Sequence, residues 1–523
     1  MTGPNRTEQN TPAQSVMTAQ QTEQTSFDIV VIGGGINGAG IARDAAGRGY
    51  CVCLLEKDDL AQATSSASTK LIHGGLRYLE HYAFRLVRES LQERSVLQSL
   101  APHIIWPMRF ILPHHKGLRP GWLIRLGLFI YDHLGGRRRV SASQRLRLNT
   151  HPAGAVLSSD FNIAFAYSDC WVEDSRLVVL NALDADRRGA QIRTRTKLVS
   201  AYPVNGQWQL SLQTDEGQKQ TITTRLLVNA AGPWAVDVLH RTGAKNNTAS
   251  LRLIKGSHLI LDRKMPSEDA FLLQNSDGRI TFMIPYEGRF TLAGTTDVDL
   301  DMAGLTGQLD ISEDEVDYLL DTLNSYLETP LNRADIVASY AGVRPLYDDG
   351  SGQAAKANRD YHLELDRQDG APLLSVFGGK LTTYRRLAEA ALLKITSAFG
   401  EDRSSWTADA PLPGGDFIHI DDVLDRLQTK IADMSDKTAL RLVRAYGTDV
   451  FTLTDAAACM ADLGIQFGGG LSEAELRYLM AYEYARTAED ILNRRSKLYL
   501  HLSAEQKQQL ESWLSAEQDK LQA

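Results

Sequence analysis

FDIVVIGGGINGAGIARDAAGRGYCVCLLE, residues 27–56, is the stretch that decides the fold of this chain. Residues 29–32 are an unbroken run of Ile and Val, which is typical of a parallel strand covered on both faces. A helix is expected to follow at once, and residues 50–55 have the composition of a second strand. The stretch therefore predicts the βαβ unit of a Rossmann-type α/β domain, in which a nucleotide binds where the first strand meets the helix.

Three glycines in this stretch, Gly33, Gly35 and Gly38, fit the pattern G-x-G-x-x-G. The first allows a tight turn, the second lets the backbone approach a pyrophosphate, and the third lets helix and strand pack closely. Glu56 stands at the end of the second strand, where a carboxylate accepts hydrogen bonds from an adenosine ribose. The motif alone does not separate FAD from NAD, because both place an ADP half in the same crevice.

Length and composition are those of an ordinary soluble protein: 523 residues, 43% hydrophobic and 23% charged, enough for two or three domains. Residues 1–26 are polar and are expected to form a disordered leader. No apolar run is long enough for a membrane-spanning helix. The four cysteines, Cys51, Cys53, Cys170 and Cys459, are too scattered for a disulfide framework or a metal centre, so we expect a reducing compartment and no metal site.

Basic residues concentrate between residues 107 and 150. Nine Lys or Arg against the single acid Asp132 give this segment a net charge of +8, and the remainder of a chain of net charge −8 therefore carries −16. The nine are Arg109, Lys116, Arg119, Arg125, Arg137, Arg138, Arg139, Arg145 and Arg147. Inside the segment, residues 121–136 read GWLIRLGLFIYDHLGG. This combination fits an element lying on an anionic bilayer, or a buried helical hairpin with a solvated basic rim. A nucleic-acid surface is not expected, because the chain as a whole is acidic.

The remaining chain alternates strands, glycine-containing turns and helices. We expect a helix over 171–188, antiparallel strands over 190–212 with a turn at Asn205–Gly206, and an apolar strand over 225–234. Strands over 251–300 suggest a second sheet, and residues 375–395 return to strand, glycine pair and helix. From residue 405 onward the chain is expected to be helical throughout, with capping boxes at Ser472–Glu475 and Ser503–Gln506.

Seven blocks in order resemble one family. They are the first glycine motif, TSSASTKLIHGGLRYLE (64–80), NAAGPW (229–234), RLIKGSH (252–258), GTTD (294–297), YAGVRPL (340–346) and SVFGGKLTTYRRLAE (375–389). Together they are similar to the FAD-dependent glycerol-3-phosphate dehydrogenases, close to the respiratory bacterial enzymes, over residues 27–515. The resemblance implies a Rossmann-type FAD-binding domain of the glutathione-reductase/D-amino-acid-oxidase-like class, an antiparallel-sheet substrate domain and a C-terminal helical domain.

The domain boundaries that follow from the resemblance are simple. Residues 27–400 hold the FAD-binding domain, interleaved with the substrate sheet at about 90–165 and 250–350. Residues 405–523 form the helical domain.

The resemblance also implies which residues hold FAD. The ADP half would be bound at Gly33, Gly35, Asn37, Gly38 and Glu56, and the pyrophosphate and isoalloxazine along Ser66, Lys70, His73, Gly74 and Gly75. Ala230 and Gly232 would close over the flavin, and Gly378, Gly379, Leu381 and Thr382 would aim a helix N-terminus at it. Such a helix end suits the negative charge that gathers on a reduced flavin.

The substrate site of the family maps to Arg77, Tyr78, His258, Arg344, Arg359 and Lys380. Four of the six are fixed cations, which suits a phosphate dianion. The implied reaction is oxidation of sn-glycerol 3-phosphate at C2 to dihydroxyacetone phosphate, with hydride passing to the flavin. His258 is the candidate base and Arg344 the group that stabilises the developing alkoxide, while Arg77, Tyr78, Arg359 and Lys380 bind the substrate.

Partners and location follow from the same resemblance. Electrons would pass to ubiquinone, and because a quinone is confined to the bilayer, this favours the membrane-surface interpretation of residues 107–150. The chain is thus expected on the cytoplasmic face of the bacterial inner membrane, as a peripheral homodimer. Three alternatives stay open: an oxidase that uses oxygen, an amino-acid or sarcosine-type oxidase, and a flavin-binding sensor without turnover.

Overall fold

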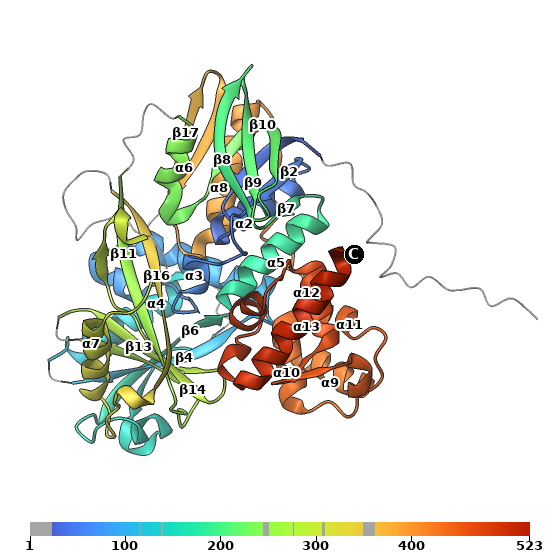
Figure 1. Ribbon diagram of the computed structural model, residues 1–523. Helices are drawn as coiled ribbons and strands as arrows, with labels where there is room; N and C mark the ends of the chain where they lie inside the picture. The colour runs from blue at the N-terminus through green and yellow to red at the C-terminus, as the bar shows by residue number, and fades with distance from the viewer. Residues whose placement is uncertain are drawn as a thin grey trace, which may run out of the picture.

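A computed structural model of the protein describes residues 24–115, 117–136, 140–243, 250–275, 277–305, 309–348 and 361–522. Two large sheets lie end to end, and a helical domain made by the last hundred or so residues stands beside the second (Figure 1). Arg359, the leader up to residue 23, Lys116 and Arg137 to Arg139 lie outside the described residues.

The predicted βαβ unit is confirmed. It consists of β1 (Ser26–Ile32), α2 (Ile36–Gly47) and β2 (Val52–Leu55), and β1 pairs in parallel with β2 on one side and β10 (Lys219–Asn229) on the other. A Cβ on Gly38 would lie 1.9 Å from the carbonyl oxygen of Gly33, so only glycine lets α2 begin this close to β1.

The first sheet has the strand order β17-β18-β10-β1-β2-β7, with β9 joined to β10 and β8 to β9. The further strands are β7 (Gln191–Arg193), β8 (Thr196–Val204), β9 (Gln207–Thr214), β17 (His362–Gln368) and β18 (Ala371–Phe377). Asn205 and Gly206, both at positive φ, make the expected turn between β8 and β9.

Both faces of the first sheet are covered, which explains the unbroken apolar run of β1. Ile29 and Val31 belong to a core shared with α2, α5 (Asp174–Arg187) and α8 (Tyr384–Phe399). Val30 and Ile32 belong to a core shared with β8, β9 and α6 (Ala235–Arg241). Side chains alternate between the two faces of a strand, so successive residues of the run pack into different cores.

The second sheet has ten strands in the order β15-β11-β14-β13-β12-β4-β6-β3, with β16 on β11 and β5 on β6. They are β3 (Leu71–Ile72), β4 (Ile105–His114), β5 (Gln144–Arg147), β6 (Ile163–Val172), β11 (Ser250–Leu261), β12 (Ala270–Gln274), β13 (Ile280–Tyr286), β14 (Phe290–Gly294), β15 (Val298–Leu300) and β16 (Ile336–Asp348). Helix α7 (Glu313–Asn324) packs on one face.

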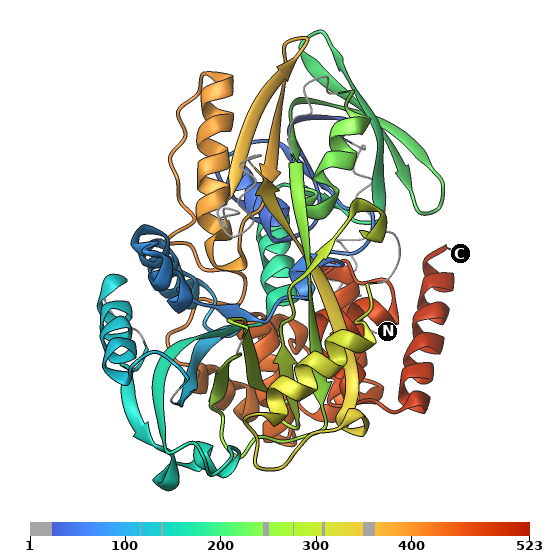
Figure 2. The same ribbon diagram turned by 90° about the vertical axis from the view of Figure 1, so that its left-hand side faces the viewer.

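Two further helices, α3 (Phe84–Leu100) and α4 (Gly121–Leu134), pack against the other face. They lie side by side at the edge of the molecule in Figure 2, in blue and cyan. The sheet was expected to start near residue 90, but that position falls inside α3, and the long strands of the first half begin at Ile105.

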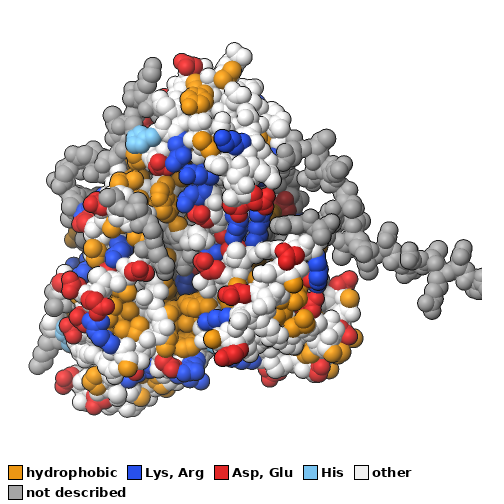
Figure 3. All heavy atoms as spheres, in the orientation of Figure 1, with side chains coloured by type: hydrophobic (Ala, Val, Ile, Leu, Met, Phe, Trp, Pro, Cys, Tyr) orange, Lys and Arg blue, Asp and Glu red, His pale blue; other side chains and the backbone are white. Residues whose placement is uncertain are grey.

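The C-terminal domain has its own apolar core. It contains α9 (Ile420–Lys430), α10 (Asp436–Tyr446), α11 (Val450–Leu453), α12 (Glu473–Tyr482), a π-helix (Asp490–Arg495) and α13 (Ala504–Gln522). The expectation of helix throughout is wrong, because residues 405–419 contain no helix and β19 (Gln466–Gly468) and β20 (Leu471–Ser472) form a small hairpin. On the face seen in Figure 3, hydrophobic side chains gather between the second sheet and this domain.

One of the two predicted capping boxes forms completely. The backbone N–H of Ser503 donates to the side chain of Gln506, and the Gln506 N–H donates back to the Ser503 hydroxyl. At the other, the Ser472 hydroxyl accepts from the N–H of Glu475, but the Glu475 carboxylate accepts from Arg441 instead of returning the bond. A guanidinium that binds both carboxylate oxygens is the stronger partner for that carboxylate.

Candidate active site

The glycine motif and Glu56 meet at the carboxyl end of the first sheet. Glu56 accepts hydrogen bonds from the N–H of Gly34 at 2.7 Å and of Asp58 at 2.8 Å. Burial raises the pKa of Glu56, and these two bonds oppose the rise. A Cβ on Gly33 would lie 2.5 Å from the carbonyl oxygen of Ala230, so the end of β10 packs directly against the glycine motif.

The hydroxyl-rich loop after β2 runs along the start of α2. The Ser65 hydroxyl accepts from the backbone N–H of Ile36 at 3.0 Å and so caps a helix N-terminus that carries no acidic residue in its first turn. Ser66, which was predicted to line the cofactor, donates to the carbonyl of Ala63 within its own turn. This loop thus places the Ser65 hydroxyl beside the helix end where a pyrophosphate binds in Rossmann-type domains.

Lys70 anchors that loop. Its Nζ lies 2.8 Å and 2.9 Å from the two carboxylate oxygens of Asp174, the first residue of α5, and both side chains are buried. The Ser68 hydroxyl donates to the same carboxylate at 2.8 Å. The positive charge of Lys70 is therefore neutralised by Asp174, and its ammonium contributes to the site by fixing the hydroxyl-rich loop to α5.

Two glycine pairs bring further loops to the same place. Gly75, Gly378 and Gly379 all have positive φ, a conformation that costs little only for glycine. The Asn37 side-chain amide donates to the carbonyl of Gly378 at 3.2 Å, which ties the first glycine motif to the second pair. The Thr382 hydroxyl accepts from the N–H of His73 at 3.3 Å, which ties that pair to the first.

The positions of the other predicted cofactor residues complete this arrangement. Gly74 is buried and its N–H donates to the hydroxyl of Tyr131. Leu381 and Thr382 lie in the short turn Leu381–Thr383, directly before α8 begins. Gly232 follows β10 at φ +57 with open space around its missing Cβ.

Three buried polar atoms of the predicted site residues have no hydrogen-bond partner among the described residues. They are Oδ1 of Asn37, Nδ1 of His258 and Nζ of Lys380. Buried polar groups in native proteins are nearly always hydrogen-bonded, so each of these atoms is available to a polar ligand. Backbone glycines, the N-terminus of α2 and unpaired polar atoms together fit a bound dinucleotide with a flavin end and a substrate beside it.

His258 lies in the middle of β11, where Gly294 of β14 and Tyr340 of β16 are its neighbours across the sheet. Its ring stacks on Tyr340 at a centroid distance of 4.8 Å, and its Nε2 is hydrogen-bonded to the Thr69 hydroxyl at 2.9 Å. Burial lowers the pKa of His258 well below its ordinary value, and the nearby cation Arg344 lowers it further. The imidazole is therefore neutral at physiological pH.

The predicted cations of the substrate site differ in their surroundings and burial. Lys380 Nζ lies 4.3 Å from the centre of the Tyr78 ring, so these two form one cluster. Arg344 donates to the hydroxyl of Thr295 at 3.0 Å and pairs with Asp297. Arg77 is exposed.

Several residues that build the site were not picked out from the sequence. Thr69, Asp174 and Tyr340 hold His258 and the hydroxyl-rich loop, and Ser65 caps α2. Three of the four stand inside the family blocks. Asp174 lies outside them. An acidic residue at the start of a predicted helix is a usual stabilising feature, so its presence gave no functional signal.

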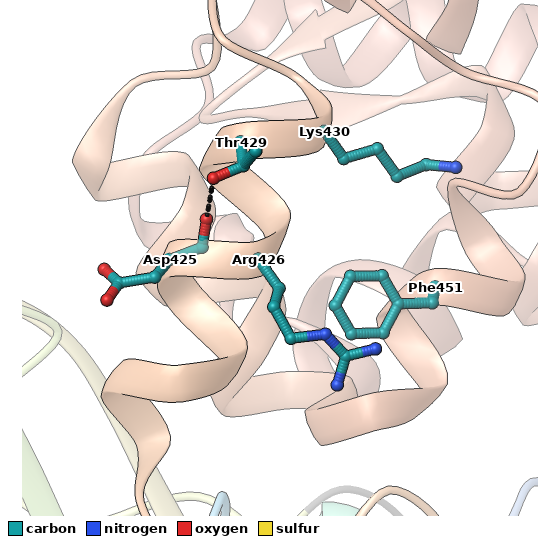
Figure 4. Close-up of a pocket in the computed structure, with 5 residues that line it drawn as sticks. All are labelled: Asp425, Arg426, Thr429, Lys430 and Phe451. Carbon is teal, nitrogen blue, oxygen red and sulfur yellow. Dashed lines mark hydrogen bonds between the residues drawn. The ribbon is translucent and has the colours of Figure 1, made fainter.

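Among the described residues, no group of three or more His, Cys, Asp or Glu side chains is placed to bind a metal ion. A hollow of about 440 Å³ opens between α9 and α11, lined by Asp425, Arg426, Thr429, Lys430 and Phe451 (Figure 4). None of the predicted site residues lines it. Within the part of the chain that the structure describes, no helix is long and apolar enough to cross a membrane.

Family models match nearly the whole chain. Residues 28–385 match the FAD dependent oxidoreductase family, and residues 405–521 match the C-terminal domain of alpha-glycerophosphate oxidase. The boundary between the two matches falls where the structure passes from α8 to the C-terminal domain.

Curated relatives are similar over most of their length. The glycerol-3-phosphate dehydrogenase of Pseudomonas aeruginosa is 50% identical over 94% of this chain and 95% of its own. The aerobic glycerol-3-phosphate dehydrogenase of Escherichia coli is 48% identical over 93% and 97%. The D-erythritol 1-phosphate dehydrogenase of Brucella abortus is also 48% identical, over 94% and 98%.

Solved structures agree with the architecture. The glycerol-3-phosphate dehydrogenase from Bacillus halodurans complexed with FAD superimposes with a TM-score of 0.71 at 25% identity, over 97% of this chain and 96% of that one. The L-alpha-glycerophosphate oxidase from Mycoplasma pneumoniae with FAD bound, at 18% identity and a TM-score of 0.56, shares the fold over 74% of this chain and 99% of its own. The cofactor that the glycine motif left open is FAD. The chain belongs to the FAD-dependent oxidoreductase family and, within it, to the FAD-dependent glycerol-3-phosphate dehydrogenases.

Proposed function

We propose that this protein oxidises sn-glycerol 3-phosphate at C2 to dihydroxyacetone phosphate. The observation that carries the proposal is the pair of buried, unpartnered atoms Lys380 Nζ and His258 Nδ1 beside the loops that would hold FAD. A desolvated cation suits a phosphate dianion, and a neutral imidazole suits an alcohol proton. Bound FAD supplies the acceptor for the hydride that leaves C2.

The proton is assigned to His258. We take Nε2–H as the donor to the Thr69 hydroxyl, which leaves the lone pair on Nδ1 to accept the proton of the substrate O2 hydroxyl. Tyr340 stacks on the ring and keeps its orientation. The depressed pKa keeps the base unprotonated, so it is ready to act at neutral pH.

The substrate is held by charge. Lys380 with Tyr78 would bind the phosphate, joined by Arg77 and by Arg359. Arg344, whose positive charge acts on His258, would stabilise the alkoxide that develops at O2. Fixing one end of a small substrate in this way positions C2 for transfer.

The test is to add sn-glycerol 3-phosphate to the FAD-loaded protein without oxygen and to follow the yellow absorption of the flavin. Bleaching is expected with this substrate and not with sn-glycerol 1-phosphate or glycerol, which lack the correct hand or the phosphate. A protein that stays yellow with sn-glycerol 3-phosphate contradicts the proposed substrate and does not affect the assignment of FAD as the cofactor.

A longer polyol phosphate is the second candidate substrate. The relative from Brucella abortus named D-erythritol 1-phosphate dehydrogenase supports it, because its identity to this chain equals that of the Escherichia coli relative. The ratio of kcat/KM for the two substrates decides between them. A kcat/KM higher for D-erythritol 1-phosphate would replace glycerol 3-phosphate as the proposed substrate.

We propose ubiquinone as the electron acceptor and oxygen as the alternative. Turnover with a soluble ubiquinone analogue should exceed turnover with oxygen, and the yield of hydrogen peroxide should fall when the quinone is present. A stoichiometric peroxide yield in the presence of quinone would favour an oxidase. An amino-acid or sarcosine-type substrate is disfavoured, because a carboxylate needs fewer cations than this site holds.

We also propose that α4 lies on an anionic membrane surface. Trp122, Leu126 and Phe129 are 70%, 47% and 55% exposed. Positions i, i+4 and i+7 share one helix face, while Leu128 and Tyr131 face the core. Exposed Arg119 and the strand β5, with exposed Arg145 and Arg147, lie near this helix in the sequence. Exposed aromatic and apolar side chains with basic neighbours are typical of a surface-lying helix.

Replacing Trp122, Leu126 and Phe129 together by Ser should move the protein from vesicles containing anionic lipid to the soluble fraction. The matched control is Ile418→Ser with Tyr202→Ser, which removes exposed apolar side chains elsewhere. Equal partitioning of the triple variant and the control would place the contact in another part of the chain. The proposed location is the cytoplasmic face of the bacterial inner membrane, and the proposed homodimer is checked by the mass measured in detergent.

A further inference from the structure

The segment Asp490–Lys497 of the C-terminal domain, which we call the clasp, reaches across to the FAD-binding domain. Its first six residues form a π-helix, and Lys497 follows at φ +59. Both conformations are uncommon, and π-helical turns occur frequently at functional sites. Ile491 and Leu492 pack into the core of the C-terminal domain, and the contacts of the clasp with the FAD-binding domain are made by charged and polar groups.

Its first contact is with Asp59, in the loop that follows β2. Arg494 Nε lies 2.6 Å from the Asp59 carboxylate, and Arg495 lies 2.6 Å and 2.8 Å from the two carboxylate oxygens. All three side chains are buried. Asp490 also pairs with Arg195 at 2.7 Å.

The loop that these charges hold belongs to the cofactor site. Asp59 is three residues beyond Glu56, whose carboxylate is bonded to the glycine motif. Two positions further on, the N–H of Ala61 donates to the carbonyl of Gly34 at 3.0 Å. Arg195 binds the same loop through its backbone N–H and the carbonyl of Asp58 at 2.9 Å.

The second contact is with Ser175, near the start of α5. Its hydroxyl donates to the carbonyl of Arg494 at 2.7 Å and accepts from Lys497 Nζ at 3.1 Å. The backbone N–H of Ser175 donates to Asp174, whose carboxylate holds Lys70 and the hydroxyl-rich loop. The clasp therefore contacts the loop after β2 directly through Asp59, and supports the hydroxyl-rich loop through Ser175 and Asp174.

We propose that the clasp couples docking of the C-terminal domain to FAD binding. It holds residues 56–61 and 66–70 in the conformation that receives the dinucleotide, with Arg495 and Lys497 as positioning residues. Coupling between two events is reciprocal, so bound FAD must in turn tighten the clasp. The inference rests on FAD as the cofactor and is independent of the proposed substrate and electron acceptor.

The first experiment uses the natural full-length chain. Hydrogen–deuterium exchange is measured on the FAD-free and the FAD-loaded protein. Exchange of amides in residues 490–497 should slow on loading, whereas amides in the core helices α10 and α12 of the same domain should change much less. Unchanged exchange at the clasp overturns the proposal, as does equal slowing over the whole domain.

The second experiment measures the Kd for FAD from the quenching of flavin fluorescence. Arg495→Lys removes the two-pronged contact with Asp59 and is expected to weaken FAD binding about tenfold, within the usual range of coupling between sites. The matched control is Arg441→Lys, which breaks a two-pronged pair with Glu475 inside the C-terminal domain. Equal affinity of Arg495→Lys and the natural chain contradicts the proposal, and so does equal weakening by the control. If the variant does not fold, the exchange experiment decides alone.

Discussion

At the residue scale, the proposed chemistry depends on a histidine whose two ring nitrogens have different surroundings. Nε2 of His258 is bonded to Thr69, and Nδ1 has no partner among the described residues. A strand position between Gly294 and Tyr340 buries the ring completely, because Gly294 has no side chain to displace it. The sequence pattern identified His258, and the packing of three strands explains why it is neutral.

Replacing His258 by Asn should lower kcat by about 10²- to 10⁴-fold, the usual contribution of a general base, and change KM little. Lys380→Met is the contrasting variant, because it removes a proposed phosphate ligand and should raise KM for sn-glycerol 3-phosphate. Steady-state kinetics with a quinone analogue measure both. A large rise in KM for His258→Asn with kcat preserved would assign the proton to another group.

The same residue makes stability depend on pH. Because the folded-state pKa of His258 lies well below 6.5, the unfolded chain binds a proton that the folded chain does not bind between that lowered value and about 6.5. The free energy of unfolding then rises with pH across this window. This contribution is present above about pH 6.5 and is lost as the pH falls.

His258→Asn should therefore show a smaller loss of Tm than the natural chain when the pH is lowered from about 7.5 to about 5.5. Thermal unfolding of both FAD-free proteins measures the difference. Equal losses in the two proteins would mean that His258 titrates at an ordinary pKa.

At the element scale, the site is made by loops at strand ends, and glycines decide how closely these loops approach. Gly379 has φ +93, and a Cβ there would lie 2.9 Å from Leu387 and 3.1 Å from the Asn37 amide. Asn37 is the residue that ties the first glycine motif to this loop. A side chain at position 379 would press the two loops apart.

Gly379→Ala should weaken FAD binding as well as reduce stability. The matched control is Gly189→Ala, since Gly189 has φ +92 and nothing within 4 Å of its missing Cβ. Both variants then carry the backbone strain of about 1–3 kcal/mol, and only Gly379→Ala also crowds Leu387 and Asn37. FAD titration and thermal unfolding separate the two effects, and equal FAD affinity of the two variants would contradict the importance of this contact.

At the scale of the whole molecule, the C-terminal domain has its own apolar core and meets the FAD-binding domain through buried charges, which include those of the clasp and the pair of Arg176 with Glu483. Two cores joined in this way can unfold separately when the cofactor is absent. Calorimetry should show two transitions for the FAD-free protein and one, at higher temperature, for the loaded protein, because FAD stabilises the folded state by mass action. A single transition in both states would mean that the two cores are joined without FAD.

The fold class and the cofactor could be predicted from the amino-acid sequence, which also supplied the candidate site residues and the candidate base. An unbroken apolar strand, spaced glycines and hydroxyl-rich loops are local patterns, and local sterics and hydrogen bonding decide them. The tertiary structure alone decided that Lys70 is matched by Asp174, that α4 presents Trp122 to solvent, and that the C-terminal domain reaches Asp59. These contacts join positions from about 100 to more than 400 residues apart along the chain or depend on which helix face finds the core, so no local pattern encodes them.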